Sequence, residues 1–182
     1  QIMEGCGLQD DRNIVLMLFV ANNFRLKGLA PLIKALAAAV SRPLARQPYL
    51  VVAGRGRSGR YRSLAHRLGV SERIVFLGSV RRIRDILSVT DVAVLPTFYD
   101  PASRFTLEAL AAGMPVITTR FNGAVDMFTD GRHGIVVDSP LNREALAGAI
   151  ANYCDPASVA AARRTIAADG VPDSVSIHNC AG

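Results

Sequence analysis

The chain has 182 residues, of which 50% are hydrophobic and 20% are charged, and its formal net charge is +6. This composition is typical of a folded globular chain of about one domain, and it excludes an intrinsically disordered protein. The longest unbroken apolar run, 14–21, is far shorter than the roughly 20 residues that cross a bilayer, so we expect no transmembrane helix.

The hydrophobic pattern alternates between strands and helices. Short apolar runs predict six strands, at 13–21, 49–53, 73–77, 92–96, 115–119 and 134–137. Apolar residues at helical spacing predict helices at 29–41, 61–68, 83–90 and 104–112, and a single helical turn at 124–128. Ser139-Pro140 and Asp155-Pro156 each have the form of an N-cap followed by proline, which predicts two further helices that end near 153 and 168.

The regular alternation of strand and helix, with short connections, predicts an α/β fold. We expect a Rossmann-like, doubly wound, six-stranded parallel sheet with helices on both faces. Residues 1–12 and 169–182 lack a pattern, so we expect a linker, a domain over 13–168 and a C-terminal tail.

The cysteines Cys6, Cys154 and Cys180 are odd in number and never form a CxxC pair, which argues against a disulfide framework and against a zinc site. No charged-then-apolar leader is present, so a cytoplasmic protein is expected. Nearly all of the positive charge is arginine, since Lys27 and Lys34 are the only lysines. Arginine favours fixed contacts with phosphate, although solvated helix faces explain the composition equally well.

Ligands of such sheets bind at the carboxyl ends of the strands, which directs attention to the loops there. The first loop, 22–28, places Arg25 and Lys27 beside Gly28 at the start of a helix, where free amides favour a phosphate. A plain surface turn is the alternative. The second loop, 54–59, reads GxGxxG but follows the second strand and lacks the acid that a dinucleotide site requires.

Two interpretations of this second loop remain. Its glycines permit a tight turn beside a ligand, which is the favoured interpretation. The alternative is an NADP site, in which Arg81 and Arg82 would meet the 2′-phosphate.

The third loop, 97–108, is the most specific. Asp100 lies in the loop and Glu108 lies in the following helix, while the helix start offers the amides of Ser103, Arg104 and Phe105. Two carboxylates can bind the hydroxyls of a polyol while the amides bind an anion, although an acid near a helix start is also an ordinary partner of the helix dipole. A carboxylate buried among the apolar neighbours of Glu108 would need partners, which favours a ligand.

At this loop the sequence resembles the donor-binding half of glycosyltransferase family 4, the retaining enzymes of GT-B fold. The segment DPASRFTLEALAAGMPVITT is similar to that family's two acids separated by seven residues and followed by EAxAxGxPVI. The resemblance covers about 13–168 and is supported by the segments RLKG, VVAGRG, VFLGSV, DVAVLPT and DGRHGIVV.

The resemblance implies a hexosyl-type transferase that moves a sugar from a nucleotide-diphosphate donor to a glycan or lipid-linked glycan, with retention of configuration. Glu108 would bind the ribose hydroxyls, Asp100 would act near the reacting sugar, and Lys27 with Arg25 would hold the diphosphate. The family usually has Glu where Asp100 stands, and often Arg where Asn22 stands. The remaining donor-binding residues implied are Gly28, Gly54, Val80, Arg81, Ser103, Arg104 and Phe105.

The resemblance also implies partners. An acceptor domain is expected before residue 1, so the isolated chain should bind nucleotide without catalysing transfer. No cofactor and no metal are expected, because cations and a helix N-terminus supply the charge, and the histidines, including His133 in a turn, are not expected to be ligands. Nucleic acid is not expected, since only 6% of residues are aromatic. Contact with an anionic membrane, and a non-catalytic nucleotide-binding module, remain alternatives.

Overall fold

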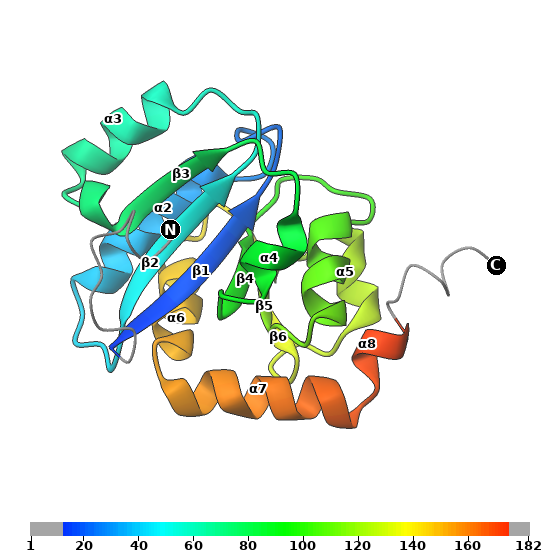
Figure 1. The fold of residues 1–182 in the computed structure, drawn as a ribbon. Helices are drawn as coiled ribbons and strands as arrows, with labels where there is room; N and C mark the ends of the chain where they lie inside the picture. Colours follow the sequence, from blue (N-terminus) through cyan, green and yellow to red (C-terminus); the bar gives the residue numbers. More distant parts are fainter. Residues whose placement is uncertain (1–12, 175–182) are drawn as a thin grey trace.

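The structure is a computed structural model that describes residues 13–174, and its centre is a six-stranded parallel sheet (Figure 1). The order of the strands across the sheet is β3-β2-β1-β4-β5-β6. The predicted fold class is therefore confirmed, as are all six predicted strands. Their bounds are β1 (Ile14–Val20), β2 (Gln47–Ala53), β3 (Ile74–Gly78), β4 (Val92–Leu95), β5 (Val116–Thr119) and β6 (Gly134–Val137).

Helices cover both faces of the sheet. On one face α2 packs against α3 and α6, and right-handed crossovers place α4 and α5 on the other face (Figure 1). The helices are α2 (Leu29–Val40), α3 (Gly59–Arg67), α4 (Ile83–Leu87), α5 (Arg104–Ala111), α6 (Arg143–Tyr153), α7 (Pro156–Ala168) and α8 (Val171–Ser174), with short 3₁₀ turns at Ser71–Arg73 and Gly123–Met127.

Strand β1 lies at the centre of the hydrophobic core. Its residues from Val15 to Phe19 are at most 4% exposed, because helices cover both faces of the sheet here. A strand buried on both faces needs apolar side chains at successive positions, which is why a continuous apolar run correctly predicted β1. Burial of such side chains contributes about 1.5–3 kcal/mol each.

The helix predicted from Ser139-Pro140 begins later than expected. The N-cap of α6 is Asn142, whose side chain accepts a hydrogen bond from the Ala145 amide at 3.0 Å. Ser139 instead accepts a hydrogen bond from the Leu141 amide at 3.2 Å, which closes a turn. The predicted cap at Asp155 is correct, because its side chain accepts from the Ala157 amide and Pro156 opens α7.

The predicted boundary of the C-terminal tail at residue 169 is wrong for its first residues. The short helix α8 packs against α5 and α7, and Val171 is buried. Asp169 joins this end of the chain to the turn before β6, since Arg132 donates to its carboxylate at 2.5 and 2.7 Å. His133 is buried in that turn and contacts Asp169 through Nε2 at 2.7 Å. The predicted linker 1–12 and the residues 175–182 lie outside the described residues.

We expect the Asp169 cluster to make stability depend on pH. Hydrogen bonds from Arg132 and His133 lower the pKa of Asp169 to about 2, from an ordinary value of 3.8. A carboxyl group whose pKa is lower in the folded state stabilises the protein above pH 4 and loses this contribution as the pH falls toward 2. The melting temperature of Asp169→Asn, measured by circular dichroism, should therefore be lower than that of the wild type at pH 7. The two should converge between pH 4 and pH 2, and a constant difference would contradict the assignment.

Cys154 lies in the core and is fully buried. Burial raises the pKa of its thiol to about 11, so it is protonated at neutral pH and acts as a small apolar side chain. Cys6 and Cys180 lie outside the described residues.

Candidate functional site

The candidate site lies where the strand order reverses, between β1 and β4. In a doubly wound sheet this reversal opens a crevice at the carboxyl ends of the two strands, because their connections lead to opposite sides. The loops that follow β1 and β4 contact each other here. The Phe98 amide donates to the Leu26 carbonyl at 2.9 Å, and the Thr97 hydroxyl donates to the same carbonyl at 3.3 Å.

Gly28 makes the contact between these two loops possible. Its φ angle is +80°, and a β-carbon at this position would lie 2.0 Å from the carbonyl oxygen of Pro96. A side chain is therefore excluded both by backbone conformation and by space. The glycine that the sequence singled out fixes the first loop against the third, at the start of α2.

Two predicted catalytic residues meet in this crevice. Lys27 Nζ lies 2.7 Å from Asp100 Oδ2 and also donates to the Tyr99 carbonyl at 3.0 Å. The two side chains are only 20% and 14% exposed, so the ion pair is largely removed from water. Residues that are 73 positions apart thus form one polar centre, which holds the ammonium group of Lys27 in a fixed place beside a carboxylate.

The helix that follows the third loop begins at Arg104, with Ser103 as its N-cap. The Ser103 hydroxyl accepts from the Thr106 amide at 3.2 Å, and the Ser103 amide donates to Asn122 Oδ1 at 3.3 Å. The expectation that the Ser103 amide is free for a ligand is therefore wrong, because a buried side chain of the protein already binds it. Helix geometry leaves the amides of Arg104 and Phe105 without a partner within the helix, and they stay candidates for an anion.

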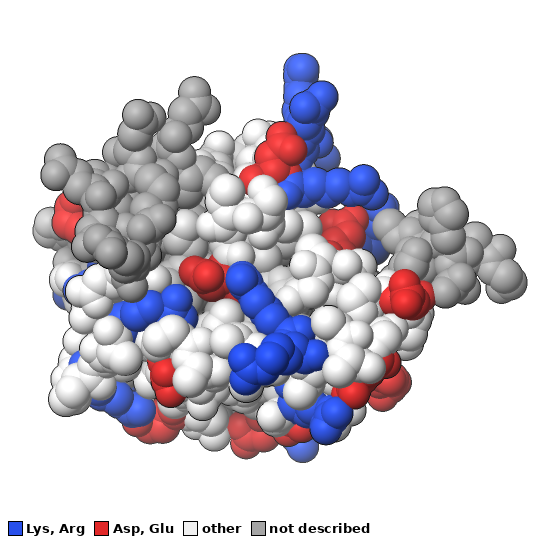
Figure 2. All heavy atoms as spheres, turned by 60° about the horizontal axis from the view of Figure 1, so that its bottom comes forward, with Lys and Arg blue, Asp and Glu red and all other residues white. Residues whose placement is uncertain are grey.

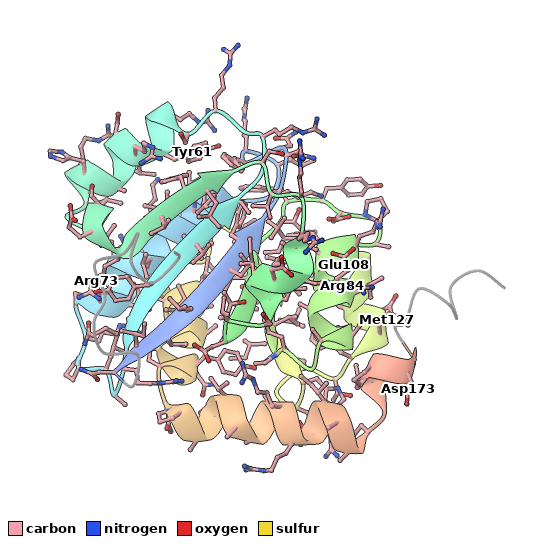
Figure 3. The ribbon with its side chains drawn as sticks, viewed as in Figure 1. Tyr61, Arg73, Arg84, Glu108, Met127 and Asp173 are labelled. Carbon is pink, nitrogen blue, oxygen red and sulfur yellow. The ribbon has the colours of Figure 1, made fainter. Side chains whose placement is uncertain are left out.

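Glu108 lies on α5 (Figure 3), one turn after Arg104. Its side chain is 28% exposed, so the expected buried carboxylate is in fact only half-buried. Arg104 Nη2 approaches Glu108 Oε1 to 3.7 Å, which is longer than a hydrogen bond, and the arginine itself is 83% exposed. The carboxylate oxygens of Glu108 therefore keep their capacity to accept hydrogen bonds from hydroxyl groups.

Asn122, which the sequence did not indicate, holds the third loop in place. It is fully buried, and its Oδ1 accepts from the amides of Ser103 and Ala124 at 3.3 and 3.1 Å. Its Nδ2 donates to the hydroxyls of Thr106 and Thr118, both at 3.0 Å. One side chain thereby joins the start of α5 to the end of β5. Asn-Gly at 122–123 is locally an ordinary turn signal, so only the distant partners reveal this role.

The backbone next to Asn122 completes the support of Asp100. The Asp100 amide donates to the Phe121 carbonyl at 3.0 Å, and the Gly123 amide donates to the Asp100 carbonyl at 2.8 Å. A β-carbon on Gly123 would lie 1.8 Å from the Pro101 carbonyl oxygen, so only glycine fits against the loop. The carboxylate of Asp100 is therefore presented from a backbone that is hydrogen-bonded on both sides.

Arg25 lines a neighbouring cavity of about 560 Å³, whose walls do not include Lys27, Asp100 or Glu108. Its role beside Lys27 stays a prediction. The walls of this cavity are Asn23, Arg25, Leu26, Ala30, Pro31, Lys34, Arg60, Phe98 and Leu141.

The second loop packs closely against Ala21, the residue that precedes the first loop. Gly54 has a φ angle of +134°, and a β-carbon there would lie 1.7 Å from the Ala21 carbonyl oxygen. Close packing against the chain itself is thus sufficient to require this glycine. Val80 is half-buried and Arg81 is exposed, in the loop between β3 and α4. This loop follows the strand next to β2, at the same edge of the sheet.

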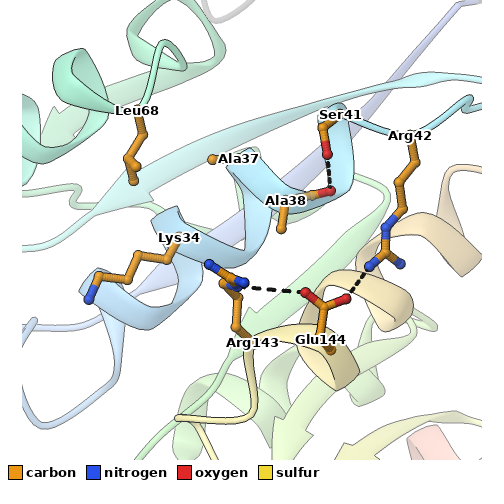
Figure 4. Close-up of a pocket in the computed structure, with 8 residues that line it drawn as sticks. All are labelled: Lys34, Ala37, Ala38, Ser41, Arg42, Leu68, Arg143 and Glu144. Carbon is orange, nitrogen blue, oxygen red and sulfur yellow. Dashed lines mark hydrogen bonds and ion pairs between the residues drawn. The ribbon is translucent and has the colours of Figure 1, made fainter.

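A second cavity of about 500 Å³ lies away from these residues, between α2, α6 and the end of α3 (Figure 4). Glu144 pairs there with Arg42 and Arg143, which connects α6 to the end of α2. None of the predicted site residues lines it, so this cavity is separate from the candidate site.

Within residues 13–174, no group of three or more His, Cys, Asp or Glu side chains is arranged to hold a metal ion. Within the same range no helix has the length and hydrophobicity to cross a membrane.

The fold and the crevice define a Rossmann-like α/β domain with a candidate ligand site at the topological switch point. The chain belongs to the family described as glycosyl transferases group 1, whose model matches residues 4–164. An uncharacterized glycosyltransferase of Methanocaldococcus jannaschii, MJ1607, is 35% identical over 144 residues, which are 78% of this chain and 35% of that protein. The lipopolysaccharide glucosyltransferase WaaG of Escherichia coli is 29% identical over 140 residues, covering 77% of this chain and 37% of WaaG.

Solved structures share the fold. The crystal structure of Anabaena Alr3699/HepE in complex with UDP superposes with a TM-score of 0.79 at 23% identity, covering 98% of this chain and 49% of that chain. The crystal structure of WaaG gives a TM-score of 0.71 at 23% identity, covering 99% of this chain and 46% of the WaaG chain. The chain thus spans about a third of the length of the curated relatives and about half of these GT-B structures.

Proposed function

We propose that this chain is the donor-binding domain of a retaining glycosyltransferase of family 4, which binds the nucleotide-diphosphate part of a sugar donor. The observation that carries the proposal is the ion pair of Lys27 and Asp100 at the switch point, with Glu108 on the helix that follows. A cation paired with one carboxylate, with a second carboxylate on the helix that follows, fits a donor that presents both phosphate and hydroxyl groups. The complexes of Anabaena Alr3699/HepE with UDP and with UDP-glucose support a nucleotide sugar as the ligand.

In the proposed mechanism each residue acts on a different part of the donor. Lys27 and the amides of Arg104 and Phe105 would stabilise the negative charge that develops on the diphosphate as the sugar leaves, which is commonly the largest catalytic contribution. Glu108 would accept hydrogen bonds from the ribose hydroxyls. Asp100 would orient the hydroxyls of the sugar, and its ion pair would keep Lys27 in place before the donor arrives.

The remainder of the enzyme is proposed to be an acceptor domain outside this chain, as the coverage of the relatives suggests. The names of the relatives WaaG and LpsE, which refer to lipopolysaccharide, favour a glycan or lipid-linked glycan as acceptor and a hexose as the transferred sugar. We propose a cytoplasmic location and a reaction that needs neither metal nor cofactor, since the cations of the chain supply the charge.

A titration of the isolated chain with a panel of nucleotides tests the proposal. We expect UDP, GDP or ADP to bind with a millimolar-to-micromolar dissociation constant in calorimetry, and the corresponding nucleotide sugars to bind at the same site. No sugar transfer is expected from the chain alone, because the proposed acceptor domain lies outside it. NADP binding in place of these nucleotides would support a dehydrogenase, and binding of none of them would contradict the proposal.

A further inference from the structure

The ammonium group of Lys27 is held differently from the charged groups on the surface of the domain. On the face that Figure 2 shows, basic and acidic side chains are interspersed on the surface, and exposed ion pairs contribute little. Lys27 is only 20% exposed, and the described part of the chain gives its Nζ two acceptors, Asp100 Oδ2 at 2.7 Å and the Tyr99 carbonyl at 3.0 Å. An ammonium group has three N–H donors, so these two acceptors set the direction of the third.

Thr97 connects the peptide groups that precede the two members of this ion pair. Its side chain is fully buried, and its hydroxyl lies 2.9 Å from the Tyr99 carbonyl and 3.3 Å from the Leu26 carbonyl. The same hydroxyl oxygen accepts a hydrogen bond from the Tyr99 amide at 3.2 Å. The Tyr99 carbonyl that Thr97 binds is also the second acceptor of Lys27. One hydroxyl group therefore fixes both loops immediately beside Lys27 and Asp100.

Thr97 is itself anchored to the end of the sheet. The Thr119 hydroxyl, at the end of β5, donates to the Thr97 carbonyl at 2.6 Å, and Thr119 is fully buried as well. The Thr97 amide donates to the Leu95 carbonyl at the end of β4, at 2.8 Å. A chain of buried hydrogen bonds thus runs from the sheet through Thr97 to the Tyr99 carbonyl and Lys27. Such chains polarise one another in the low dielectric of a protein interior, which makes them rigid.

A buried threonine can also serve stability alone, and Thr90 is such a residue. It is 3% exposed, and its hydroxyl donates to the Ile86 carbonyl in the helix that precedes it, at 3.0 Å. Thr90 precedes β4 and Thr97 follows it, so the two threonines lie at opposite ends of that strand. The contacts of Thr97 instead join loops that are 71 positions apart and lead to a side chain of the candidate site. Thr90 is therefore a matched control for Thr97.

We propose that Thr97 is a positioning residue, which holds the ammonium group of Lys27 toward the diphosphate of the donor. The inference rests on the proposed function and adds to it a residue that the sequence did not indicate. Because Thr97 is fully buried, it acts on the ligand only through Lys27. Without its hydroxyl the Tyr99 peptide loses two hydrogen bonds and is free to rotate, and Asp100 alone does not fix the direction of the ammonium group.

Reductive methylation with formaldehyde and cyanoborohydride tests the proposal without any nucleotide. Lys27 and Lys34 are the only lysines, so mass spectrometry of peptides resolves both, and the exposed Lys34 is an internal reference. Methylation needs a free amine. We therefore expect Thr97→Val, which keeps the shape and removes the hydroxyl, to raise the rate at Lys27 relative to Lys34 about fivefold, which corresponds to one hydrogen bond. Thr97→Ser should restore the wild-type ratio, and Thr90→Val should leave it unchanged.

Nucleotide affinity connects this positioning to the ligand. In Thr97→Val, UDP or whichever nucleoside diphosphate binds best should bind about fivefold more weakly than in the wild type. The corresponding nucleoside lacks phosphate, so its affinity, measured by NMR titration, should not change. Thr97→Ser should recover the affinity for the diphosphate, and Thr90→Val should bind both ligands as the wild type does.

The outcomes separate the positioning role from the proposed function. An unchanged methylation ratio in a folded Thr97→Val would overturn the positioning role, and so would equal increases at Lys27 and Lys34. An equal loss of affinity for the diphosphate and for the nucleoside would overturn it too. If the wild type bound no nucleotide while the ratio rose as expected, the proposed function would be wrong and Thr97 would still hold Lys27. If Thr97→Val does not fold, Thr97→Cys, whose thiol is a weak donor, gives the same comparison.

Discussion

Replacing Glu108 with glutamine is expected to weaken the binding of UDP, or of whichever nucleoside diphosphate binds best, about a hundredfold. The carboxylate is half-buried, and within residues 13–174 the cation that it pairs with, on Arg104, lies 3.7 Å away, which is longer than a hydrogen bond. Two hydrogen bonds from adjacent ribose hydroxyls to a charged acceptor are each worth about 1.5–3 kcal/mol. Glutamine keeps the size of the side chain but removes the charge and replaces one acceptor with a donor.

The control for this variant is Glu144→Gln, which changes a carboxylate on α6 outside the candidate site. Glu144 is 64% exposed and pairs with Arg42 and Arg143, outside the candidate site, so its replacement should leave nucleotide affinity unchanged. Calorimetry gives both dissociation constants, and circular dichroism checks that both variants melt near the wild-type temperature. If Glu108→Gln bound the nucleotide as tightly as the wild type, the proposed contact with ribose would be wrong.

The strands of the sheet could be predicted because their signals are local. Each strand is a short apolar run, and burial on both faces requires such a run whatever the distant sequence is. The site follows from the topology, since loops after strands meet at one edge of a parallel sheet. Lys27 and Asp100 were therefore identified from their loops, and the structure brings them together.

Predictions from the sequence were wrong where one local pattern is compatible with two different structures. A serine before a proline can cap a helix or close a turn, since the hydroxyl accepts a nearby amide in both, and at Ser139 the turn formed. The exposure of Glu108 depends on how α5 packs on the sheet, which its apolar neighbours in sequence do not determine. The helix at Val171–Ser174 has only four residues, too few to show a periodic pattern.

The support of the third loop could not be predicted, because it depends on contacts across the fold. Asn122 forms hydrogen bonds with residues that lie 19, 16 and 4 positions before it in the sequence. These sequence separations do not form a periodic pattern. An Asn-Gly turn would have the same sequence if the side-chain amide of the asparagine faced solvent. The structure therefore assigns to this residue a role that only its burial and its partners define.

Replacing Asn122 with alanine is expected to lower the free energy of unfolding by about 3 kcal/mol or more. The variant leaves the amides of Ser103 and Ala124 and the hydroxyls of Thr106 and Thr118 without their partner in a site with no solvent access. Buried polar groups that lose a hydrogen bond cost about 1–3 kcal/mol each, and relaxation of the loop recovers part of this cost. Urea denaturation of the variant and the wild type gives the difference directly.

The same variant should also weaken nucleotide binding, because the start of α5 and the backbone of Asp100 lose their common support. Binding is measured by calorimetry without urea, at a temperature at which circular dichroism shows that the variant is folded, so that unfolding does not contribute. Asn152→Ala, which removes an exposed asparagine from α6, is the matched control and should change neither quantity. A folded Asn122→Ala with wild-type affinity would show that Asn122 stabilises the domain without positioning the site. A loss of stability below about 1 kcal/mol would instead contradict the buried network itself, since even one unsatisfied group costs that much.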